Sequence, residues 1–492
     1  MFDPHDLAVR IRAGTPLLVI ETHEEALLVD AFRHVVGELF RPLWRWSITT
    51  GLARLDMDDP FVPAATDSSA VLDLLRREPQ RGIWLLLDFS PYLRYAMSVR
   101  MLREVVLGQA AAKQTVVLIG AKIELPPELE PLATRFTMRL PNDAALAKLL
   151  REEAFAWSRE HAGRRVEIDA TAQRAVLRHL RGLALHDARR IVRELVHDNG
   201  RIDPDDVARV QRAKFDLLGR GGVIALEPDV AQMDQIAGLL RLKRWVEQRR
   251  VVFVADTPPK GLDRPRGMLL LGVQGAGKSL AAKACAGGFG VPLLRLDFGA
   301  LYNKFHGETE RNLREALATA EAMAPCVLWC DEIEKGLATS DSDDGVSRRV
   351  LGTLLTWMNE RRAPVFLVAT ANDIQRLPPE FLRKGRFDEI FFVDLPDDSA
   401  RRDAFAIHLQ RREHDPARFD LEVLVRASEG FSGAEIEQAI VSALYDAHAD
   451  TARLDTVRLR HALDQTRPLS VLMAEQVQWL RAWAGERCVP AN

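Results

Sequence analysis

Cysteine is scarce in this sequence, and long apolar runs are missing. Only 4 of the 492 residues are cysteine, too few for a disulfide framework in a chain of this length. Cys326 and Cys330 lie four apart in a run predicted to be a strand, which separates their Cα atoms by roughly 13 Å and excludes a disulfide between them. No stretch reaches the ~18 apolar residues of a membrane span, so we expect no membrane anchor.

A dominant charge of one sign is missing as well. The formal net charge is −3, and Lys and Arg form no long run, so nothing attracts the whole chain to nucleic acid or to an anionic membrane. No nucleic-acid recognition motif is present either, and we do not expect nucleic acid as a partner. The first residues include Asp3, His5 and Asp6 where a secretory signal has basic and then apolar residues, which favours a cytoplasmic protein.

The chain contains one α/β pattern twice. Its length predicts two or three domains. Short apolar runs alternate with amphipathic segments, as in a parallel sheet with crossover helices, and each such stretch precedes a helical one. The expected segments are an α/β module (1–140), a helical segment (141–215), a linker with a helix around 234–248 (216–266), an α/β domain (267–397), a helical lid (398–466), and an amphipathic helix with a tail (467–492).

The strands of both sheets are predicted from apolar runs. In the first module they are 17–22, 43–49, 83–89, 115–121 and 136–140, and in the second domain 268–272, 292–297, 326–331, 365–370 and 390–394. The runs of the second domain do not alternate with polar residues, which is typical of strands covered on both faces. Within 468–484 we expect one helix with Met473, Val477, Leu480 and Ala484 on one side.

A phosphate-binding motif opens the second domain. Residues 272–279, GVQGAGKS, fit G-x-x-x-x-G-K-[ST] at every fixed position. Lys278 is expected to reach the β and γ phosphates and Ser279 to hold Mg²⁺. A glycine turn without a ligand is the alternative, but the apolar strand before the motif and the Ala-rich helix after it favour phosphate. The predicted contacts are Gly272, Val273, Gln274, Gly275, Ala276, Gly277, Lys278, Ser279 and Leu280.

Two further strands end in polar side chains. Asp331 is expected to bind Mg²⁺ through water, and Glu332 to deprotonate the attacking water, a role worth roughly 10²–10⁴ in rate. Acidic pairs at strand ends are common, but the end of a neighbouring strand places this pair in a ligand crevice. Asn372 could hold the same water, although a single Asn at a strand end is more often a turn former.

Arg383 and Arg386 supply positive charge late in the domain. Both cannot easily reach the phosphates of their own subunit from this position. An arginine finger inserted into a neighbour's site, worth roughly 10³–10⁵ in turnover, would explain them. Surface ion pairing is the alternative.

Taken together, these residues resemble the AAA+ ATPases over about residues 230–466. In order, GVQGAGKS, DEIEK, SRRVLGTLLTWMNE, RKGRFDEIFFVDLP and GFSGAEIEQAI are similar to the hypothetical chloroplast open reading frame 46 family of algae, cyanobacteria and other bacteria. The tail PLSVLMAEQVQWLRAWA is similar to that family's C-terminus. The resemblance implies a P-loop NTPase core with a helical lid. It also implies ATP and Mg²⁺ as cofactors, and a homo-oligomer, a hexameric ring or spiral, that hydrolyses ATP to ADP and phosphate at its subunit interfaces.

The resemblance also implies roles for individual residues. It gives Asp331 and Glu332 the Walker B roles, Asn372 the sensor position, and Arg383 and Arg386 the trans-acting positions. It places Ile236 and Ala237 against adenine, with Ala237 replacing the usual glycine, and Gly433 and Ala434 of the lid near adenine and ribose. Phe305, His306 and Gly307 match a central-pore loop, with His306 where an aliphatic residue is usual; alternatively, Phe305 packs a helix start.

Two classes of function fit these features. One is a motor that remodels an unidentified protein substrate. The other is an ATP-dependent assembly switch or scaffold that binds a partner without threading it. Intact Glu332 and both arginines favour turnover in either class, while His306 and the absence of a peptidase-docking motif weaken an unfoldase. A nucleic-acid motor is disfavoured by the charge balance.

Residues 15–32, TPLLVIETHEEALLVDAF, repeat the strand–loop–helix layout without its glycines. Thr22-His23-Glu24-Glu25 stands at the loop position with two carboxylates that would repel phosphate, and Phe89 stands where the catalytic Glu would follow Asp88. The recurring pairs are Leu17 and Leu269, Asp88 and Asp331, Val117 and Phe366, Leu140 and Leu395, and Gly182 and Gly430. Any two α/β domains share a strand rhythm, yet we predict a degenerate, nucleotide-free AAA+-like module for assembly or docking, and one ATP per chain.

Overall fold

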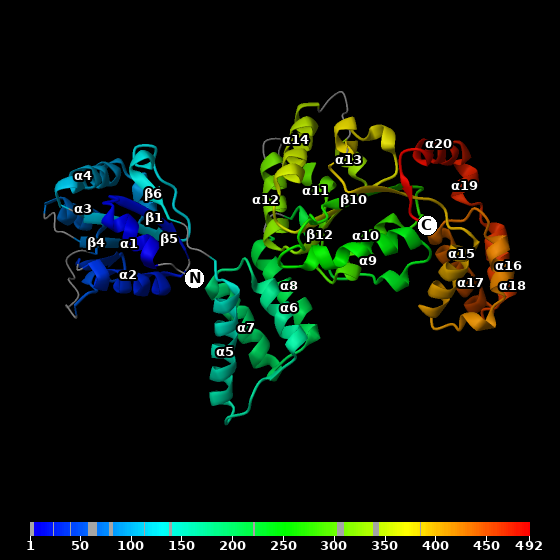
Figure 1. Cartoon of the computed structure of the whole chain (residues 1–492), viewed down its shortest axis with the longest axis horizontal. Coiled ribbons are helices and arrows are strands. Elements are labelled where there is room, and N and C mark those ends of the chain that lie inside the picture. The colour runs from blue at the N-terminus through cyan, green and yellow to red at the C-terminus, as the bar shows by residue number, and fades with distance from the viewer. Residues whose placement is uncertain are drawn as a thin grey trace. The chain divides into compact units, whose positions relative to one another are not determined.

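The computed structural model describes residues 4–22, 24–39, 41–57, 66–77, 82–112, 114–136, 140–219, 222–302, 309–337, 344–383 and 385–492. The chain folds into two compact units, Met1–Val210 and Gln211–Asn492, and Figure 1 labels many of their elements. Among the helices of the described ranges, none combines the length and the apolar character that a membrane span needs. All four cysteines are free thiols.

The first unit begins with a six-stranded sheet in the order β3-β2-β4-β5-β1-β6. Its strands are β1 (Leu17–Glu21), β2 (Leu43–Ser47), β3 (Gly51–Arg54), β4 (Gly82–Leu87), β5 (Gln114–Gly120) and β6 (Ala133–Arg135). The β2–β3 pair is antiparallel and the others are parallel. One face packs on α1 (Pro4–Arg12) and α2 (Glu25–Leu39), and the other on α3 (Ser68–Arg77) and α4 (Ala96–Ala112).

A helical segment follows this sheet. Its helices are α5 (Asp143–Glu160), α6 (Ala170–Leu180), α7 (Leu185–Asn199) and α8 (Pro204–Leu218), with a two-residue ladder between β7 (Glu167–Ile168) and β8 (Arg201–Ile202). The buried Glu153 of α5 accepts hydrogen bonds from Arg189 (2.8 Å) and Arg193 (2.9 Å) of α7. Because both arginines compensate the buried carboxylate, this network fixes α7 against α5.

The second unit contains a seven-stranded sheet in the order β15-β14-β10-β13-β12-β11-β9. Its strands are β9 (Ile224–Glu227), β10 (Gly267–Gly272), β11 (Leu293–Leu296), β12 (Cys326–Cys330), β13 (Val365–Ala371), β14 (Glu389–Val393) and β15 (Val489–Pro490). Only β9 runs antiparallel to its neighbour. One face packs on α9 (Leu240–Val254) and α10 (Lys278–Phe289), and the other on α11 (Phe298–Tyr302), α12 (Thr309–Ala322), α13 (Ile333–Leu337) and α14 (Asp344–Glu360).

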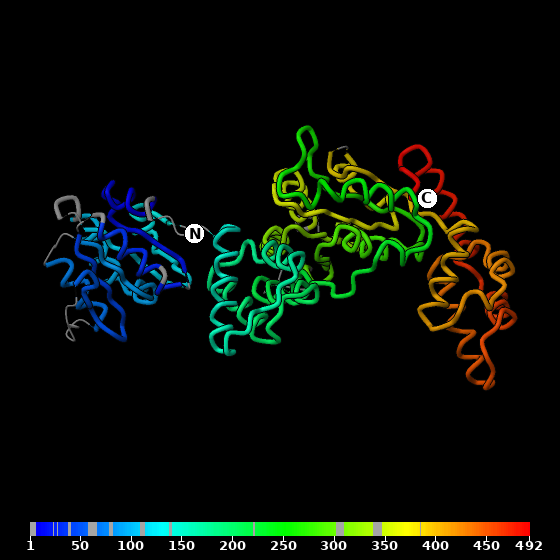
Figure 2. The backbone as a smooth tube through the Cα atoms, turned by 60° about the horizontal axis from the view of Figure 1, so that its bottom comes forward, coloured from blue at the N-terminus to red at the C-terminus, as the bar shows by residue number. Residues whose placement is uncertain are grey.

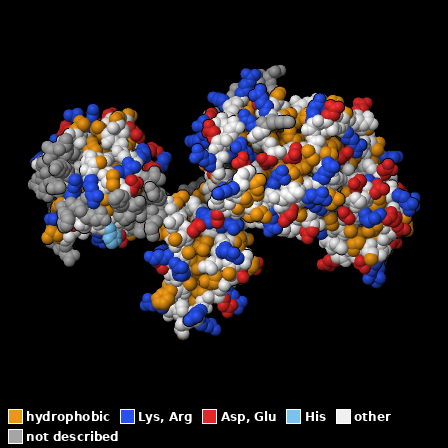
Figure 3. All heavy atoms as spheres, viewed as in Figure 1, with side chains coloured by type: hydrophobic (Ala, Val, Ile, Leu, Met, Phe, Trp, Pro, Cys, Tyr) orange, Lys and Arg blue, Asp and Glu red, His pale blue; other side chains and the backbone are white. Residues whose placement is uncertain are grey.

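A helical lid with its own apolar core follows β14. It consists of α15 (Asp398–Gln410), α16 (Leu421–Ala427), α17 (Gly433–Ala449) and α18 (Thr456–Gln465), and α19 (Leu469–Leu472) and α20 (Ala474–Gly485) lead back to β15. The tube in Figure 2 follows this return from the lid to the sheet. On the face shown in Figure 3, basic and acidic side chains of the described residues are interspersed, as the small net charge suggests.

The two sheets share one topology. When the five main parallel strands of each sheet are numbered along the chain, both sheets have the spatial order 5-1-4-3-2. β1, β4, β5 and β6 therefore correspond to β10, β12, β13 and β14. The α/β fold with two successive parallel sheets, each followed by helices, is confirmed.

Most predicted strands agree with the observed ones within about two residues, but two helix predictions are wrong. The structure has a strand, β6, just before the range 136–140, of which 137–139 lies outside the described residues, so the strand predicted there stays a prediction. The helix expected around 234–248 is a 3₁₀ turn (Met233–Gln235) followed by α9, because Gly238 and Leu239 both have positive φ. The last helix is broken at Met473, which is 39% exposed, while Val477, Leu480 and Ala484 are buried.

Candidate functional site

The glycine-rich loop joins β10 to α10. β10 ends at Gly272, where an added Cβ would lie 2.0 Å from the carbonyl oxygen of Val393, so a larger residue would separate β10 from β14. Gly277 has φ +98° and directly precedes α10, a conformation that glycine adopts at no steric cost. The loop thus leads the chain into the N-terminus of α10, where free N–H groups favour an anion.

Lys278 lies inside this loop. Its side chain is 7% exposed, and Nζ donates to the carbonyl oxygens of Gly272 (2.9 Å) and Val273 (2.8 Å). Burial lowers the pKa of this ammonium to about 8, against the opposing influence of Glu334, Asp331 and Glu332. The predicted phosphate-binding cation is therefore held at the centre of the loop by backbone carbonyls.

The two predicted Mg²⁺ residues lie together. Ser279, in the first turn of α10, donates from Oγ to Oδ1 of Asp331 (3.3 Å), just beyond β12. Thr370 of β13 donates to the same oxygen at 2.6 Å. A hydroxyl and a carboxylate are the hard oxygen ligands that Mg²⁺ takes beside nucleotide phosphates, so these residues fit that ion. The described residues contain no cluster of three or more acidic, His or Cys ligands, and Mg²⁺ beside phosphates does not need one.

The predicted base and sensor also meet. Glu332 has φ +46°, and its Oε1 accepts a hydrogen bond from Nδ2 of Asn372 (2.9 Å). The backbone N–H of Glu332 donates to Oγ1 of Thr370 (3.0 Å), which links the base to the Asp331 contact. Lys335 forms an ion pair with the other carboxylate oxygen of Glu332. A carboxylate and an amide that share a hydrogen bond can together hold one water molecule.

Glu334 is a site residue that the sequence prediction missed. Its side chain is 3% exposed, and Oε1 accepts the backbone N–H of Asn372 at 3.0 Å. Burial raises the pKa of this carboxyl group above its ordinary value. Glu334 thus holds Asn372, the predicted sensor, and Thr370 holds Asp331 and Glu332, the predicted Walker B pair. Glu334 is the second Glu of the motif DEIEK, but the sequence alone does not show whether its carboxyl group is buried or exposed to solvent.

The lid contacts the loop. Ser432 caps α17, and the N–H of Ala434 donates to the carbonyl oxygen of Gly275 at 3.4 Å. Gly433 and Ala434 therefore lie beside the phosphate loop. On the side predicted for adenine, Ile236 is buried and its carbonyl accepts Nζ of Lys243 at 2.6 Å, while Ala237 packs against the lid core.

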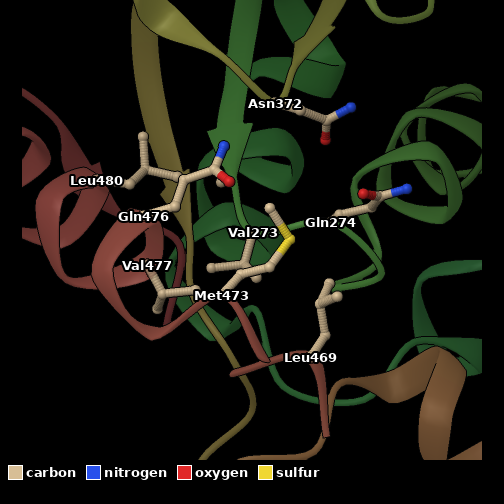
Figure 4. A pocket seen from close by; sticks show the side chains of 9 residues that line it. Val273, Gln274, Asn372, Leu469, Met473, Gln476, Val477 and Leu480 are labelled. Carbon is tan, nitrogen blue, oxygen red and sulfur yellow. The ribbon is translucent and has the colours of Figure 1, made fainter. Parts of the chain in front are cut away.

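The segment after the lid also reaches the loop. A small cavity of about 50 Å³ lies between the loop and α19–α20, and Figure 4 shows the side chains that line it. Its lining residues are Gly272, Val273, Gln274, Asn372, Leu469, Met473, Gln476, Val477 and Leu480. Arg481 of α20 is paired with Asp394, which follows β14. The sequence predicted a helix in this segment but not that the segment lines a cavity together with the glycine-rich loop and Asn372.

The remaining predicted residues lie elsewhere. Arg383 is exposed, and Arg386 donates to the carbonyl of Leu355 in α14 at 2.7 Å. Within the described residues, neither arginine has a hydrogen bond or ion pair with the phosphate loop, so their trans role stays a prediction. The predicted pore loop, Phe305, His306 and Gly307, lies outside the described residues.

The corresponding position of the first unit has different chemistry. Glu24 lies between β1 and α2, and its carboxylate accepts the N–H of His186 in the first turn of α7. Asp88 follows β4 with φ +50°, but Phe89 is buried and packs edge-on against Trp46. His23 is outside the described residues. An acid therefore takes the place of the loop glycines, and an apolar side chain fills the position of the base.

The chain is similar to known proteins of the AAA class. The family described as "ATPase family associated with various cellular activities (AAA)" matches residues 268–395. The N-terminal and second domains of SpoVK-like AAA ATPases match residues 4–138 and 144–221.

The "uncharacterized AAA domain-containing protein ycf46" of Trieres chinensis is 34% identical over 97% of this chain and 96% of its own length. Its counterpart in Pyropia yezoensis is 32% identical over 98% and 97%. The proteasome-activating nucleotidase of Aeropyrum pernix is 37% identical over 40% of this chain and 49% of its own.

Proposed function

The chain belongs to the ycf46 family of AAA domain-containing proteins, and from this premise we propose that it hydrolyses ATP at the interfaces of a hexameric ring or spiral to remodel a protein substrate. One observation carries the catalytic part of the proposal. A continuous set of hydrogen bonds joins Ser279, Asp331, Thr370, Glu332 and Asn372 beside the phosphate loop.

Each member of this set has a distinct task. Lys278 leaves the carbonyls of Gly272 and Val273 and binds the β and γ phosphates. Ser279 and, through water, Asp331 would hold Mg²⁺, and the bound ion would neutralise charge on the phosphates. Glu332 accepts the proton of the attacking water, and Asn372, which is hydrogen-bonded to Glu332, orients that water.

The hydrogen bond between Glu332 and Asn372 (2.9 Å) supports turnover in either class of function. The preference for remodelling over a switch rests on a similarity to another protein. The nucleotidase of Aeropyrum pernix, which is similar over the ATPase part, is named for activating a proteasome, and that likeness supports action on proteins. A switch or scaffold remains the second candidate because His306 stands where a pore loop usually has an aliphatic residue.

Glu332→Gln tests the catalytic assignment. The amide cannot accept a proton from water, so we expect unchanged ATP affinity and turnover reduced by roughly 10²-fold or more. Calorimetric titration gives the affinity, and phosphate release gives the rate. The matched control is Glu380→Gln at an exposed position, which should behave as the wild type. Wild-type turnover in Glu332→Gln would refute the assignment, and stimulation of turnover by unfolded protein would separate a remodelling enzyme from a switch.

A further inference from the structure

The turn between the predicted adenine segment and α9 is strained. Gly238 has φ +60° and Leu239 has φ +55°. Leu239 is not glycine, so its left-handed conformation costs free energy and persists only where its surroundings hold it. Leu239 is buried and provides no side-chain cap for α9, so the first N–H groups of this helix need acceptors from another part of the chain.

Residues 489–492 provide those acceptors. The carbonyl of Ala491 accepts the N–H groups of Arg241 and Leu242, both at 3.1 Å. The side-chain oxygen Oδ1 of Asn492 accepts the N–H of Leu239. Ala491 also donates its own N–H to Phe392 of β14 at 3.0 Å. The tail is therefore fixed to the sheet on one side and caps α9 on the other.

The lid meets the same turn. A Cβ added to Gly238 would lie 2.9 Å from Cβ of Ala400 in α15 and 2.9 Å from Oδ1 of Asn492. Arg411 at the end of α15 donates to the carbonyl of Gln235 at 3.4 Å. The turn is thus enclosed by lid and tail, and Figures 1 and 2 both place the C end where the lid meets the sheet domain.

We propose that Ala491 and Asn492 are positioning residues for recognition of the nucleotide base. By holding the left-handed turn, they fix Ile236 and Ala237, which lie three and two residues before Leu239, in the position predicted for the base. The inference rests on the proposed ATPase function and adds that selectivity for adenine depends on the tail. The residues predicted to bind phosphate and Mg²⁺ are on other elements. The tail therefore affects binding of the base and does not affect the rate of ATP hydrolysis.

Asn492→Ala in the full chain is the test. Loss of the acceptor for a buried N–H should raise KM and Kd for ATP roughly five- to tenfold and reduce the preference for ATP over GTP. The kcat at saturating ATP should stay within about twofold of the wild type, because transition-state contacts are unchanged. Asn492→Asp keeps an acceptor oxygen and should restore wild-type KM. Glu486→Ala, at an exposed position before β15, is the matched control.

A second variant keeps the proposal falsifiable if Asn492→Ala does not fold. Gly238→Ala places a methyl group against Asn492 and Ala400 and should raise KM and relax base preference in the same way. Unchanged KM and base preference in a folded Asn492→Ala or Gly238→Ala, with wild-type turnover intact, would overturn this inference and leave the ATPase proposal standing. A wild-type chain that binds no ATP would overturn the ATPase proposal itself.

Discussion

Lys278 is an ammonium that donates hydrogen bonds to the carbonyl groups of its own loop. Its hydrogen bonds to Gly272 and Val273 compensate its burial, yet its pKa is lowered to about 8. Phosphate must replace these carbonyls as the partner of Nζ and favours the charged form of the lysine. Nucleotide binding is therefore linked to the protonation state of this one residue.

ATP affinity should consequently fall at alkaline pH. Below the free-site pKa of about 8, Lys278 is charged before ATP binds, so no proton is taken up. Above that pH, binding must take up a proton, and Kd should rise by up to roughly tenfold per pH unit. Calorimetry between about pH 7.5 and 9.5, in buffers of different ionisation enthalpy, measures both the affinity and the proton uptake.

Lys278→Arg is the control for that experiment. A guanidinium stays charged throughout the range, so any binding that this variant retains should show no proton uptake. A wild-type Kd that stays constant to pH 9.5 would mean that Lys278 is already charged at every pH and that its burial does not lower the pKa in solution.

At the scale of elements, Arg386 is held by its contact with α14. Its guanidinium donates to Leu355, whereas Arg383 is exposed. This stretch therefore presents arginine at a surface and not at the phosphate loop of its own chain, as a finger for a neighbouring copy requires.

Mixing two inactive variants tests this arrangement. Arg386→Ala should bind ATP normally and lose roughly 10³-fold or more in turnover, while Lys278→Ala should not bind ATP. Mixed assemblies contain some interfaces with an intact loop and an intact arginine, so phosphate release should reappear on mixing. Arg376→Ala, at an exposed position, is the control and should be active alone. No recovery at any ratio, with mixed assembly demonstrated, would contradict a trans role.

The elements also show what the sequence could predict. The loop, Asp331, Glu332 and Asn372 were predictable because strand ends and motif spacing fix their positions locally. β9 and β15 were not, because strands of four and two residues form only when β11 and β14 are present to pair with them. The break before α9 at Leu239 depends on a hydrogen bond to Asn492, 253 residues away. Helix propensity is a local property and cannot predict such a contact.

At the scale of the whole molecule, the shared strand order places Glu24 and Phe89 where the second unit has its loop and its base. Glu24 holds the first turn of α7, much as Gly275 contacts the first turn of α17 through Ala434. A carboxylate fixed at this position repels phosphate. We therefore propose that the first unit keeps the architecture without the nucleotide.

The full chain should accordingly bind one ATP. Calorimetric titration of the wild type should give a stoichiometry of about one, and Lys278→Ala in the full chain should bind none, because the first unit has no equivalent lysine in its loop. Folding of the variant is checked by its thermal transition. Residual binding of one ATP per chain in Lys278→Ala would show that the first unit has a nucleotide site.

The short strands at the margins of the second sheet have a consequence for solubility. A chain that we propose assembles with copies of itself is held at high local concentration, where an open sheet edge invites pairing between copies. β9, a strand of four residues that runs antiparallel to β11, forms one edge of the sheet, and β15, a strand of two residues, forms the other. β15 includes Pro490, which has no N–H to offer a further strand. The tail that caps α9 therefore also protects the sheet against aggregation during assembly.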